Sequence, residues 1–504
     1  MKVLIFHGYL LRGTGSNVYN ASLAAALAGL GHEVHMVCQD RDAPDLTPPG
    51  ATGSVTVHAP DIGGLLPVYV HDTYEGFEVK TFAELTDGEL DTYLDANVTA
   101  VRDLVDSLGG VDAALGNHLV MGPVILARAG LRYAAVVHGS DLSYTVIPDL
   151  ERFGPYAREA CDGASGILVG SGHIQARLRQ AVDDPAINAK VRLGPPGVDT
   201  TLFAPIPQSD RPARLRATAA AIKAAGGVEA AAADAGAATS WDRDLDRAAD
   251  AVEWFAGAEG PRVIYVGKLI VSKGVDLLLA AWPTVHARNP GARLLVVGFG
   301  AADEVLRDAW SALERGDVGP LRELAAHGRG LEGGEDEPLS MLAAFLADLP
   351  EGYADAARAA AGSVEFSGRL EHDEVATPVA ASDALVFPST FPEAFGMVAA
   401  EAAAAGALPV SARHSGAAEV SRELAADLPA DVAPLVSFDL GDDAVDQIAA
   451  RLNAWLALPE AERRAAGEAL RETCDRIWSW QGVARTVLAA SAGELEDLPV
   501  PVED

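Results

Sequence analysis

The chain begins with the sequence MKVLIFHGYLLRGTGSNVYNASLAAALAGLGHEVHMVC (residues 1–38), which has the pattern of a β-α-β unit. Val3–Phe6 is a short apolar run typical of a buried parallel strand, and a glycine-containing turn follows it. A helix rich in alanine and leucine is predicted from about Asn17 to Leu30. The run 33–38 is then a second strand, so the chain opens with a strand, a crossover helix and a parallel strand.

Strand-like apolar runs alternate with helical stretches in two separate series, one in each half of the chain. The first series continues with residues 113–115, 134–137 and 166–169, and the second comprises residues 263–267, 294–297, 364–366, 384–387 and 408–410. Strands that alternate with helices indicate parallel sheets covered by helices on both faces. The predicted fold class is therefore α/β, with two doubly wound parallel-sheet domains facing across a cleft and mainly helical insertions.

Changes in composition predict four segments. Residues 1–205 form an N-terminal Rossmann-like domain, and the alanine-rich residues 206–260 form a helical insertion or linker on the surface. Residues 261–475 form a C-terminal Rossmann-like domain, with a second helical insertion near 301–361. Residues 476–504 form a C-terminal helix and an acidic tail that frays at its end.

The composition excludes several classes of function. The chain has 504 residues, and 38 Lys and Arg against 72 Asp and Glu give a net charge of −34. Such an acidic surface repels nucleic acid and anionic lipid, which argues against both as partners. Three widely spaced cysteines, Cys38, Cys161 and Cys474, predict no disulfide framework. No apolar run approaches the roughly 18 residues of a membrane helix, and no signal-peptide core is present, so the sequence predicts a soluble, cytoplasmic protein.

Two lysines lie in the loop Gly267–Gly274, directly after a predicted strand of the second series. Lys268 and Lys273 stand out because this chain is poor in lysine. The carboxyl edge of a parallel sheet is the usual ligand crevice, where two ammonium groups can neutralise a diphosphate, including one that departs as a leaving group. The alternative is that both are ordinary solvated surface lysines.

A second loop, Pro388–Gly396, follows the strand 384–387 and leads into an alanine-rich helix. Glu393 is predicted near the start of this helix, and Glu401 comes eight residues later, a rise of roughly 12 Å if all eight residues are helical. That separation exceeds the about 5–9.5 Å between the paired carboxylates of glycosidases. It suits the two ends of one extended ligand, whereas a buried helix explains the alanines but not the two glutamates.

The first half contains two weaker candidate sites. The turn 12–17 places small residues before a helix N-terminus, where backbone N–H groups can approach an anion. This turn lacks the GxGxxG fingerprint of dinucleotide-binding proteins, so it is interpreted either as a ligand-binding loop or as a plain tight turn. His138 follows the strand 134–137 at the same edge, where a structural role is the alternative. The triplets 40–42 and 242–244 have an Asp-x-Asp pattern, which is interpreted here as solvated charge rather than a metal clamp.

Together these motifs resemble the retaining family-4 glycosyltransferases of the GT-B type, which have two Rossmann-like domains. The most specific part is the Glu-x7-Glu signature from Glu393 to Glu401, within the sequence Phe391-Pro392-Glu393-Ala394-Phe395-Gly396. Further stretches that match the family in order and spacing are residues 29–34, 197–199, 267–274, 406–410 and 415–420.

The resemblance implies that residues 261–475 bind a nucleotide-diphospho-sugar donor and that residues 1–205 face the acceptor. Lys268 and Lys273 would hold the donor diphosphate, although the family usually has Arg at the position of Lys268. Glu393 would lie beside the transferred sugar, and Glu401 would accept hydrogen bonds from the ribose hydroxyls.

Other contacts are implied by the same resemblance. His138 matches a histidine that contacts the donor sugar near the reacting carbon. Thr14 and Gly15 stand where the family usually has Gly-Gly. The backbone N–H groups that would contact sugar hydroxyls are those of Ala394, Phe395, Gly396 and Met397. Glu393, His138 and Lys273 would then be the catalytic residues, and the helix around 478–481 would cross back to the N-terminal domain.

The family works without a metal and without a cofactor, so the resemblance implies a metal-independent, retaining hexosyltransferase. Residues 1–200 contain 13 Lys and Arg and 24 Asp and Glu, a net charge of −11, with no basic cluster. We therefore expect a soluble sugar or small-molecule acceptor and no stable membrane association. The alternatives are a non-catalytic protein of the same fold that binds a sugar nucleotide or polysaccharide and, less favoured without GxGxxG, a nicotinamide dehydrogenase.

Overall fold

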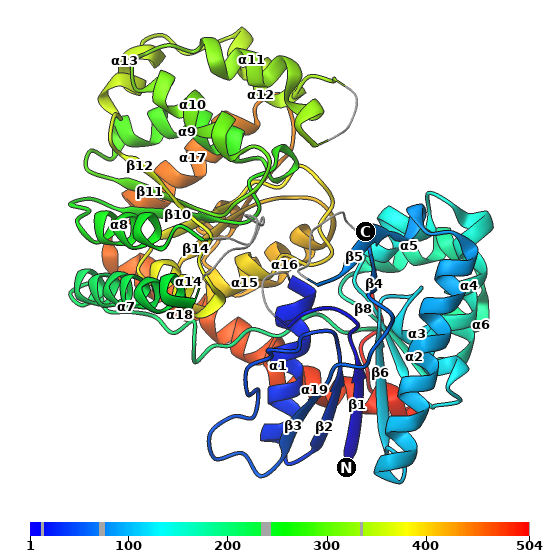
Figure 1. The fold of residues 1–504 in the computed structure, drawn as a ribbon. Coiled ribbons are helices and arrows are strands. Elements are labelled where there is room, and N and C mark those ends of the chain that lie inside the picture. Colours follow the sequence, from blue (N-terminus) through cyan, green and yellow to red (C-terminus); the bar gives the residue numbers. More distant parts are fainter. Residues whose placement is uncertain (12–14, 70–75, 233–242, 333–335, 503–504) are drawn as a thin grey trace. The chain divides into compact units, whose positions relative to one another are not determined.

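The computed structural model describes residues 1–11, 15–69, 76–232, 243–332 and 336–502. These residues form two compact units (Figure 1). The first contains Met1–Gly197 and the C-terminal segment from Trp478 onward, and the second contains Val198–Ile477. The chain therefore passes to the second unit after residue 197, whereas the sequence predicted the end of the first domain at residue 205.

The first unit is built on a seven-stranded sheet in which every neighbouring pair is parallel, as the strand and helix alternation predicts. The strand order is β3-β2-β1-β6-β7-β8-β9. The strands are β1 (Lys2–Phe6), β2 (Glu33–Val37), β3 (Ser54–His58), β6 (Ala113–Asn117), β7 (Ala134–Val137), β8 (Gly166–Val169) and β9 (Val191–Leu193). A separate parallel pair is formed by β4 (Leu65–Val68) and β5 (Glu78–Thr81).

Helices cover both faces of this sheet. The helices of the first unit are α1 (Gly15–Gly29), η1 (Phe82–Glu84), α2 (Asp87–Leu108), α3 (Gly122–Arg128), η2 (Leu142–Val146), α4 (Leu150–Gly163), α5 (Gly172–Ala181), α6 (Pro185–Asn188) and α19 (Trp480–Ala492). On one face, α1 and α19 share a core with β1 and β2, in which Leu23 and Val487 are buried together with Ile5 and Val34. The C-terminal helix α19 is thus part of the first unit's core.

The second unit has a six-stranded parallel sheet with the order β12-β11-β10-β13-β14-β15. Its strands are β10 (Arg262–Val266), β11 (Arg293–Val297), β12 (Val364–Gly368), β13 (Ala384–Phe387), β14 (Leu408–Ala412) and β15 (Ser437–Phe438). The chain enters this sheet at β10 and later returns beside it at β13, where Val263 pairs with Ala384. The loops after these two strands therefore leave the sheet side by side at its carboxyl edge.

The second unit contains more helices than the first. They are α7 (Arg211–Ala232), α8 (Leu245–Ala256), η3 (Val271–Lys273), α9 (Val275–Arg288), α10 (Asp303–Leu313), α11 (Gly319–His327), η4 (Gly328–Glu332), α12 (Ser340–Ala347), α13 (Tyr353–Ala359), α14 (His372–Ala380), α15 (Met397–Ala404), α16 (Ser415–Ala426), η5 (Ala433–Val436), α17 (Ala444–Ala457) and α18 (Glu460–Ile477). Within the segment 301–361, the described residues include helices α10, α11, η4, α12 and α13. However, α8 packs on β11 and β12 and buries Phe255 completely, so residues 245–256 belong to the unit's core rather than its surface.

None of the helices in the described parts of the chain is both long and apolar enough to cross a membrane.

Candidate functional site

The lysine-bearing loop after β10 lies directly against the loop after β13. Gly274 has a positive φ of 69°, and a Cβ atom at this position would lie 2.0 Å from the carbonyl oxygen of Pro388. The carbonyl oxygen of Ser272 accepts hydrogen bonds from the backbone N–H of Thr390 at 2.8 Å and from its hydroxyl at 3.2 Å. A side chain at position 274 would not fit this close approach, so glycine permits the two loops to touch.

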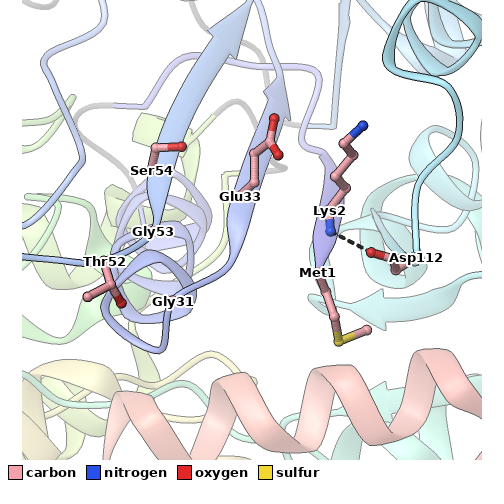
Figure 2. A pocket seen from close by; sticks show the side chains of 8 residues that line it. All are labelled: Met1, Lys2, Gly31, Glu33, Thr52, Gly53, Ser54 and Asp112. Atoms are coloured by element: carbon pink, nitrogen blue, oxygen red, sulfur yellow. Dashed lines mark hydrogen bonds between the residues drawn. The ribbon is translucent and has the colours of Figure 1, made fainter.

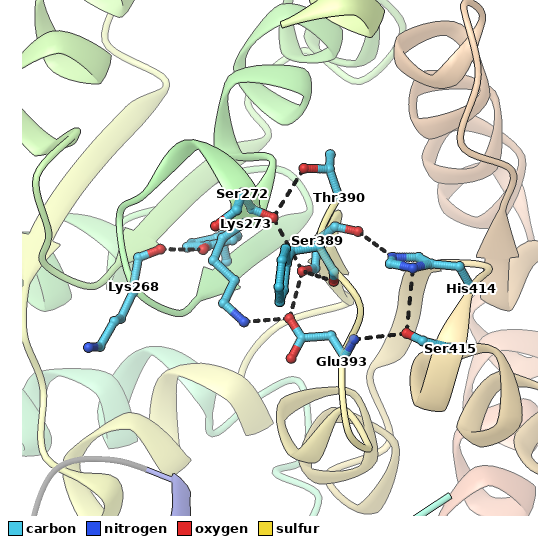
Figure 3. A network of polar contacts seen from close by, with 10 residues as sticks. Lys268, Ser272, Lys273, Ser389, Thr390, Glu393, His414 and Ser415 are labelled. Carbon is cyan, nitrogen blue, oxygen red and sulfur yellow. Dashed lines mark hydrogen bonds and ion pairs between the residues drawn. The ribbon is translucent and has the colours of Figure 1, made fainter. Parts of the chain in front are cut away.

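The contact between these loops brings together two residues that the sequence singled out separately (Figure 3). The ammonium of Lys273 forms an ion pair with Oε1 of Glu393, and the hydroxyl of Ser389 donates to the same oxygen at 2.6 Å. The side chains of Lys273 and Glu393 are 26% and 17% exposed, so the pair is largely, but not fully, withdrawn from water. A fixed cation and a fixed anion therefore lie at the edge where a parallel sheet binds ligands.

Residues at the start of α16 hold the glutamate loop from its other side (Figure 3). The backbone N–H of Glu393 donates to the hydroxyl of Ser415 at 2.8 Å, and the N–H of Gly416 donates to the carbonyl of Glu393 at 3.0 Å. Nε2 of His414 lies 2.8 Å from the carbonyl oxygen of Ser389, which can only accept, so Nε2 carries the proton. Ser389 and His414 were not predicted; their position directly after neighbouring strands was the available signal.

The position of Glu393 corrects the expectation that it lies in the first turn of a helix. Helix α15 begins at Met397, and Gly396 precedes it with a φ of 114°. Glu393, Ala394 and Phe395 therefore belong to the loop that precedes the helix, and Gly396 adopts a positive φ that favours glycine. The separation of roughly 12 Å worked from eight helical residues consequently does not apply to the two glutamates.

Glu401 lies in α15 and is only 7% exposed. Its Oε1 receives a hydrogen bond of 2.8 Å from Nε2 of His372, the first residue of α14. Burial alone would lower the pKa of His372, but the hydrogen bond to Glu401 and the charges of Glu401, Asp199 and Asp373 together outweigh burial and raise it. The sequence did not point to His372 as a partner of the second glutamate.

Lys268 contributes to the site in a different way from Lys273. Its backbone carbonyl accepts a hydrogen bond from the hydroxyl of Tyr265 at 2.9 Å, which anchors the start of the loop. In Figure 3 its side chain points away from Glu393. Within the described part of the chain its ammonium forms no ion pair. Lys268 is thus a cation of the same loop that is not joined to the pair of Lys273 and Glu393.

The candidate residues of the first unit lie at the carboxyl ends of its strands. Gly15 is the first residue of α1 and is exposed, whereas Thr14 lies outside the described residues. His138 follows β7, and its Nε2 lies 2.7 Å from Oδ1 of Asn117. Burial and the neighbouring His7 lower the pKa of His138 to about 3, so its imidazole is neutral at pH 7.

Two further histidines that the sequence did not single out share this edge. His7 follows β1, and its ring nitrogens lie 2.9 Å from Oδ1 of Asn17 and 3.0 Å from Nδ2 of Asn20. His118 follows β6 with a positive φ of 62°, and its ring lies 4.5 Å from that of His138. Burial lowers the pKa of His7 to about 4 and that of His118 well below its usual value. The argument used for His138, a histidine directly after a strand, applied equally to both.

Two surface hollows lie away from these residues. One of about 500 Å³ is formed at the amino ends of β1, β2 and β3, where the backbone N–H of Lys2 donates to Asp112 at 2.7 Å (Figure 2). The other, of about 600 Å³, lies among α10, α11 and η4. Neither contains a candidate residue, and the first lies at the opposite end of its strands from the edge that binds ligands in this class of fold.

Comparison with known families finds one match in each half of the chain. Residues 13–202 match the family model described as Glycosyltransferase Family 4, and residues 354–472 match the model described as Glycosyl transferases group 1. Glycogen synthase of Mycobacterium tuberculosis is 28% identical over 262 residues, 50% of this chain and 49% of the relative. The chain thus spans about half the length of this relative. A GDP-mannose-dependent alpha-(1-6)-phosphatidylinositol monomannoside mannosyltransferase from the same species is 23% identical over 371 residues, 72% of this chain and 70% of the relative.

Solved structures show the same fold at low sequence identity. Sucrose-phosphate synthase from Thermosynechococcus elongatus has a TM-score of 0.57 at 18% identity, covering 96% of both chains. Anabaena Alr3699/HepE in complex with UDP and glucose has a TM-score of 0.56 at 15% identity, covering 99% of this chain and 100% of that one. With two parallel sheets, of seven and six strands, and both family models matched in order, the chain belongs to the family-4 (group 1) glycosyltransferases of the GT-B type.

Proposed function

We propose that this protein is a retaining glycosyltransferase that moves a hexose from a nucleotide-diphospho-sugar to a hydroxyl acceptor without a metal ion. The observation that carries the proposal is the junction of the loops after β10 and β13. There, Lys273 contacts Glu393, and Lys268 supplies a second positive charge from the same loop. Cations of this kind stabilise a departing diphosphate because the charge that they meet grows as the bond to the sugar breaks.

The reaction breaks the bond between the anomeric carbon and the diphosphate oxygen and forms a bond to the acceptor oxygen on the same face of the sugar. The acceptor's proton passes to the leaving phosphate. An ammonium has three N–H donors, so the bond from Lys273 to Glu393 leaves two for phosphate oxygens. Lys268 offers a point charge where the family usually has a two-pronged guanidinium.

The remaining residues have roles in holding the donor. Glu393 lies beside the transferred sugar, whose hydroxyls also meet backbone N–H groups of the segment Ala394–Met397. The N–H of Met397, the first residue of α15, has no acceptor within the helix, which makes it suitable for this purpose, and Ala394–Gly396 supply N–H groups of the preceding loop. Glu401 accepts hydrogen bonds from the ribose hydroxyls.

His138 presents a defined tautomer to the donor sugar. Nδ2 of Asn117 donates to the carbonyl of Phe6 at 3.0 Å and to Oδ1 of Asn20 at 2.8 Å, so Oδ1 of Asn117 is left to accept the proton of His138 Nε2. Nδ1 of the neutral His138 then carries a lone pair that can accept a hydrogen bond from a sugar hydroxyl.

The proposed acceptor is a soluble sugar or another small molecule. Residues 1–200 carry 13 positive and 24 negative side chains, a net charge of −11, which repels an anionic membrane surface. The names of two relatives point to different kinds of acceptor, since one is described as a glycogen synthase and the other as a phosphatidylinositol monomannoside mannosyltransferase. Binding of the protein to anionic vesicles at physiological salt would contradict a soluble acceptor.

The decisive experiment is a donor panel. Purified protein is incubated with UDP-, GDP- and ADP-sugars and a host extract, and products are identified by mass spectrometry. We expect one donor to be consumed, unchanged turnover in EDTA, and loss of turnover in Glu393→Ala. Donor binding without transfer would support the non-catalytic alternative, and no binding to any sugar nucleotide, with Glu393→Ala indistinguishable from wild type, would refute the proposal.

A further inference from the structure

His372 and Glu401 form a contact between the first turn of α14 and the buried face of α15. The distance from Nε2 of His372 to Oε1 of Glu401 is 2.8 Å, and their side chains are 33% and 9% exposed. A carboxylate only accepts hydrogen bonds, so the proton of the imidazole lies on Nε2. Within the described residues, the second oxygen of Glu401, Oε2, accepts no further hydrogen bond from another side chain.

The imidazole of His372 is itself held in place from a third element. The ring of Phe203, which is fully buried, packs against it with a centroid separation of 5.2 Å and an interplanar angle of 57°. The charged groups that face it are Glu401 on α15, Asp199 in the segment that precedes Phe203, and Asp373 on its own helix. These contacts fix the ring and, through it, the position of one carboxylate oxygen.

We propose that His372 is a positioning residue that sets the orientation of the Glu401 carboxylate and thereby determines how strictly the ribose of the donor is recognised. His372 donates its hydrogen bond to Oε1 of Glu401, so Oε2 of Glu401 is left to accept a hydrogen bond from a ribose hydroxyl. This inference rests on the proposed function, in which Glu401 receives the ribose. A carboxylate that is already oriented loses less conformational entropy when it forms that hydrogen bond than one that is free to rotate. It also discriminates more sharply against a ligand that lacks the hydroxyl.

The test measures ribose selectivity rather than overall affinity. Isothermal titration calorimetry first identifies which of UDP, GDP and ADP binds the wild-type protein most tightly. The same nucleotide is then compared with its 2′-deoxy and 3′-deoxy forms. We expect the ribonucleotide to bind roughly ten-fold or more tightly than at least one deoxy form, as is typical of a hydrogen bond to a charged group. Glu401→Gln should reduce this ratio.

The variants at position 372 separate a positioning role from a structural one. His372→Leu should reduce the ratio to about three-fold or less. His372→Gln keeps an N–H donor at a similar distance from Glu401, so we expect it to retain most of the selectivity. The matched control is His286→Gln, a histidine in α9 of the same unit that, among the described residues, forms no hydrogen bond with His372 or Glu401.

Three results would overturn the inference. The first is an affinity ratio of ribonucleotide to deoxynucleotide that stays at the wild-type value in His372→Leu although Glu401→Gln reduces it. The second is equal weakening of the ribonucleotide and deoxynucleotide in His372→Leu, which would assign His372 a merely structural role. The third is a wild-type ratio in Glu401→Gln, which would mean that Glu401 does not read the ribose. By contrast, a wild-type protein that binds none of the three nucleotides would refute the proposed function itself.

Discussion

Replacing Gly274 with alanine tests whether the contact between the two donor-side loops depends on the absence of a side chain. The added Cβ would lie 2.0 Å from the carbonyl oxygen of Pro388, well inside the 3.0 Å below which such contacts essentially do not occur. The loops must therefore separate by about 1 Å, which stretches the hydrogen bonds that Thr390 donates to the carbonyl of Ser272. Two lost bonds at about 1 kcal/mol each, plus about 1–2 kcal/mol for alanine at a positive φ, give a destabilisation of about 3–4 kcal/mol.

Gly362→Ala is the matched control for this substitution. Gly362 has almost the same φ, 72° against 69°, and lies in the same unit, but a Cβ there would meet no atom within 4 Å. The free energy of unfolding of Gly362→Ala should fall only by about 1–2 kcal/mol, the cost of placing alanine at a positive φ. The difference between the two variants therefore isolates the close approach to Pro388.

Urea unfolding followed by hydrogen-exchange mass spectrometry provides the assay. Peptides from β10 and β13 report on the second unit separately, which matters because a chain with two units is not expected to unfold in one step. Nucleoside diphosphate binding is measured on the same samples and should be lost in Gly274→Ala and kept in Gly362→Ala. Equal destabilisation of the two variants, within about 0.5 kcal/mol, would refute the reasoning.

Three further predictions address individual charges. In a double-mutant cycle of Lys273→Met and Glu393→Gln, urea unfolding should give a coupling of about 1–3 kcal/mol, and a value near zero would show that the ion pair adds nothing. Lys268→Ala should leave the free energy of unfolding within about 0.5 kcal/mol of wild type but weaken the binding of a nucleoside diphosphate. If calorimetry shows an unchanged affinity in this variant, Lys268 does not belong to the donor site. His7 and His138 have pKa values of about 4 and about 3 in the folded protein, below the 6.5 of the unfolded chain, so the unfolded state binds more protons between these values. The first unit should therefore lose stability as pH falls from 6.5 toward 3, and the loss should be less steep in His7→Gln. An unfolding midpoint that does not change with pH over that range would contradict this prediction.

The features predicted correctly from the sequence are those set by local pattern. Apolar runs that alternate with helical stretches predicted two parallel sheets, because a strand buried on both faces leaves a recognisable signature. The motif around Glu393 and Glu401 identified the family. The order of strands within each sheet, and hence the adjacency of β10 and β13, depends on packing between distant segments and was not predicted.

The errors and omissions at the site have a common physical origin. Glu393 was expected in the first turns of the alanine-rich helix, but the helix begins only at Met397, after Gly396 at a φ of 114°. The partners His372 and Ser415 come from segments 29 and 22 residues away from the glutamates that they contact. A single sequence records such pairs only as isolated polar residues, since nothing local shows which of them meet.

The place of α19 in the first unit has a consequence for how the protein is made. Its residues Val483 and Val487 complete the core against α1, and Trp480 lies against Gly197. The ribosome must therefore synthesise the whole second unit, residues 198–477, before the first can close its core. At roughly 5–20 residues per second, that is a delay of roughly 15–60 s during which a seven-stranded sheet lacks one of its covering helices. A nascent chain stalled before residue 478 should accordingly be a preferred client of chaperones that recognise exposed apolar surface.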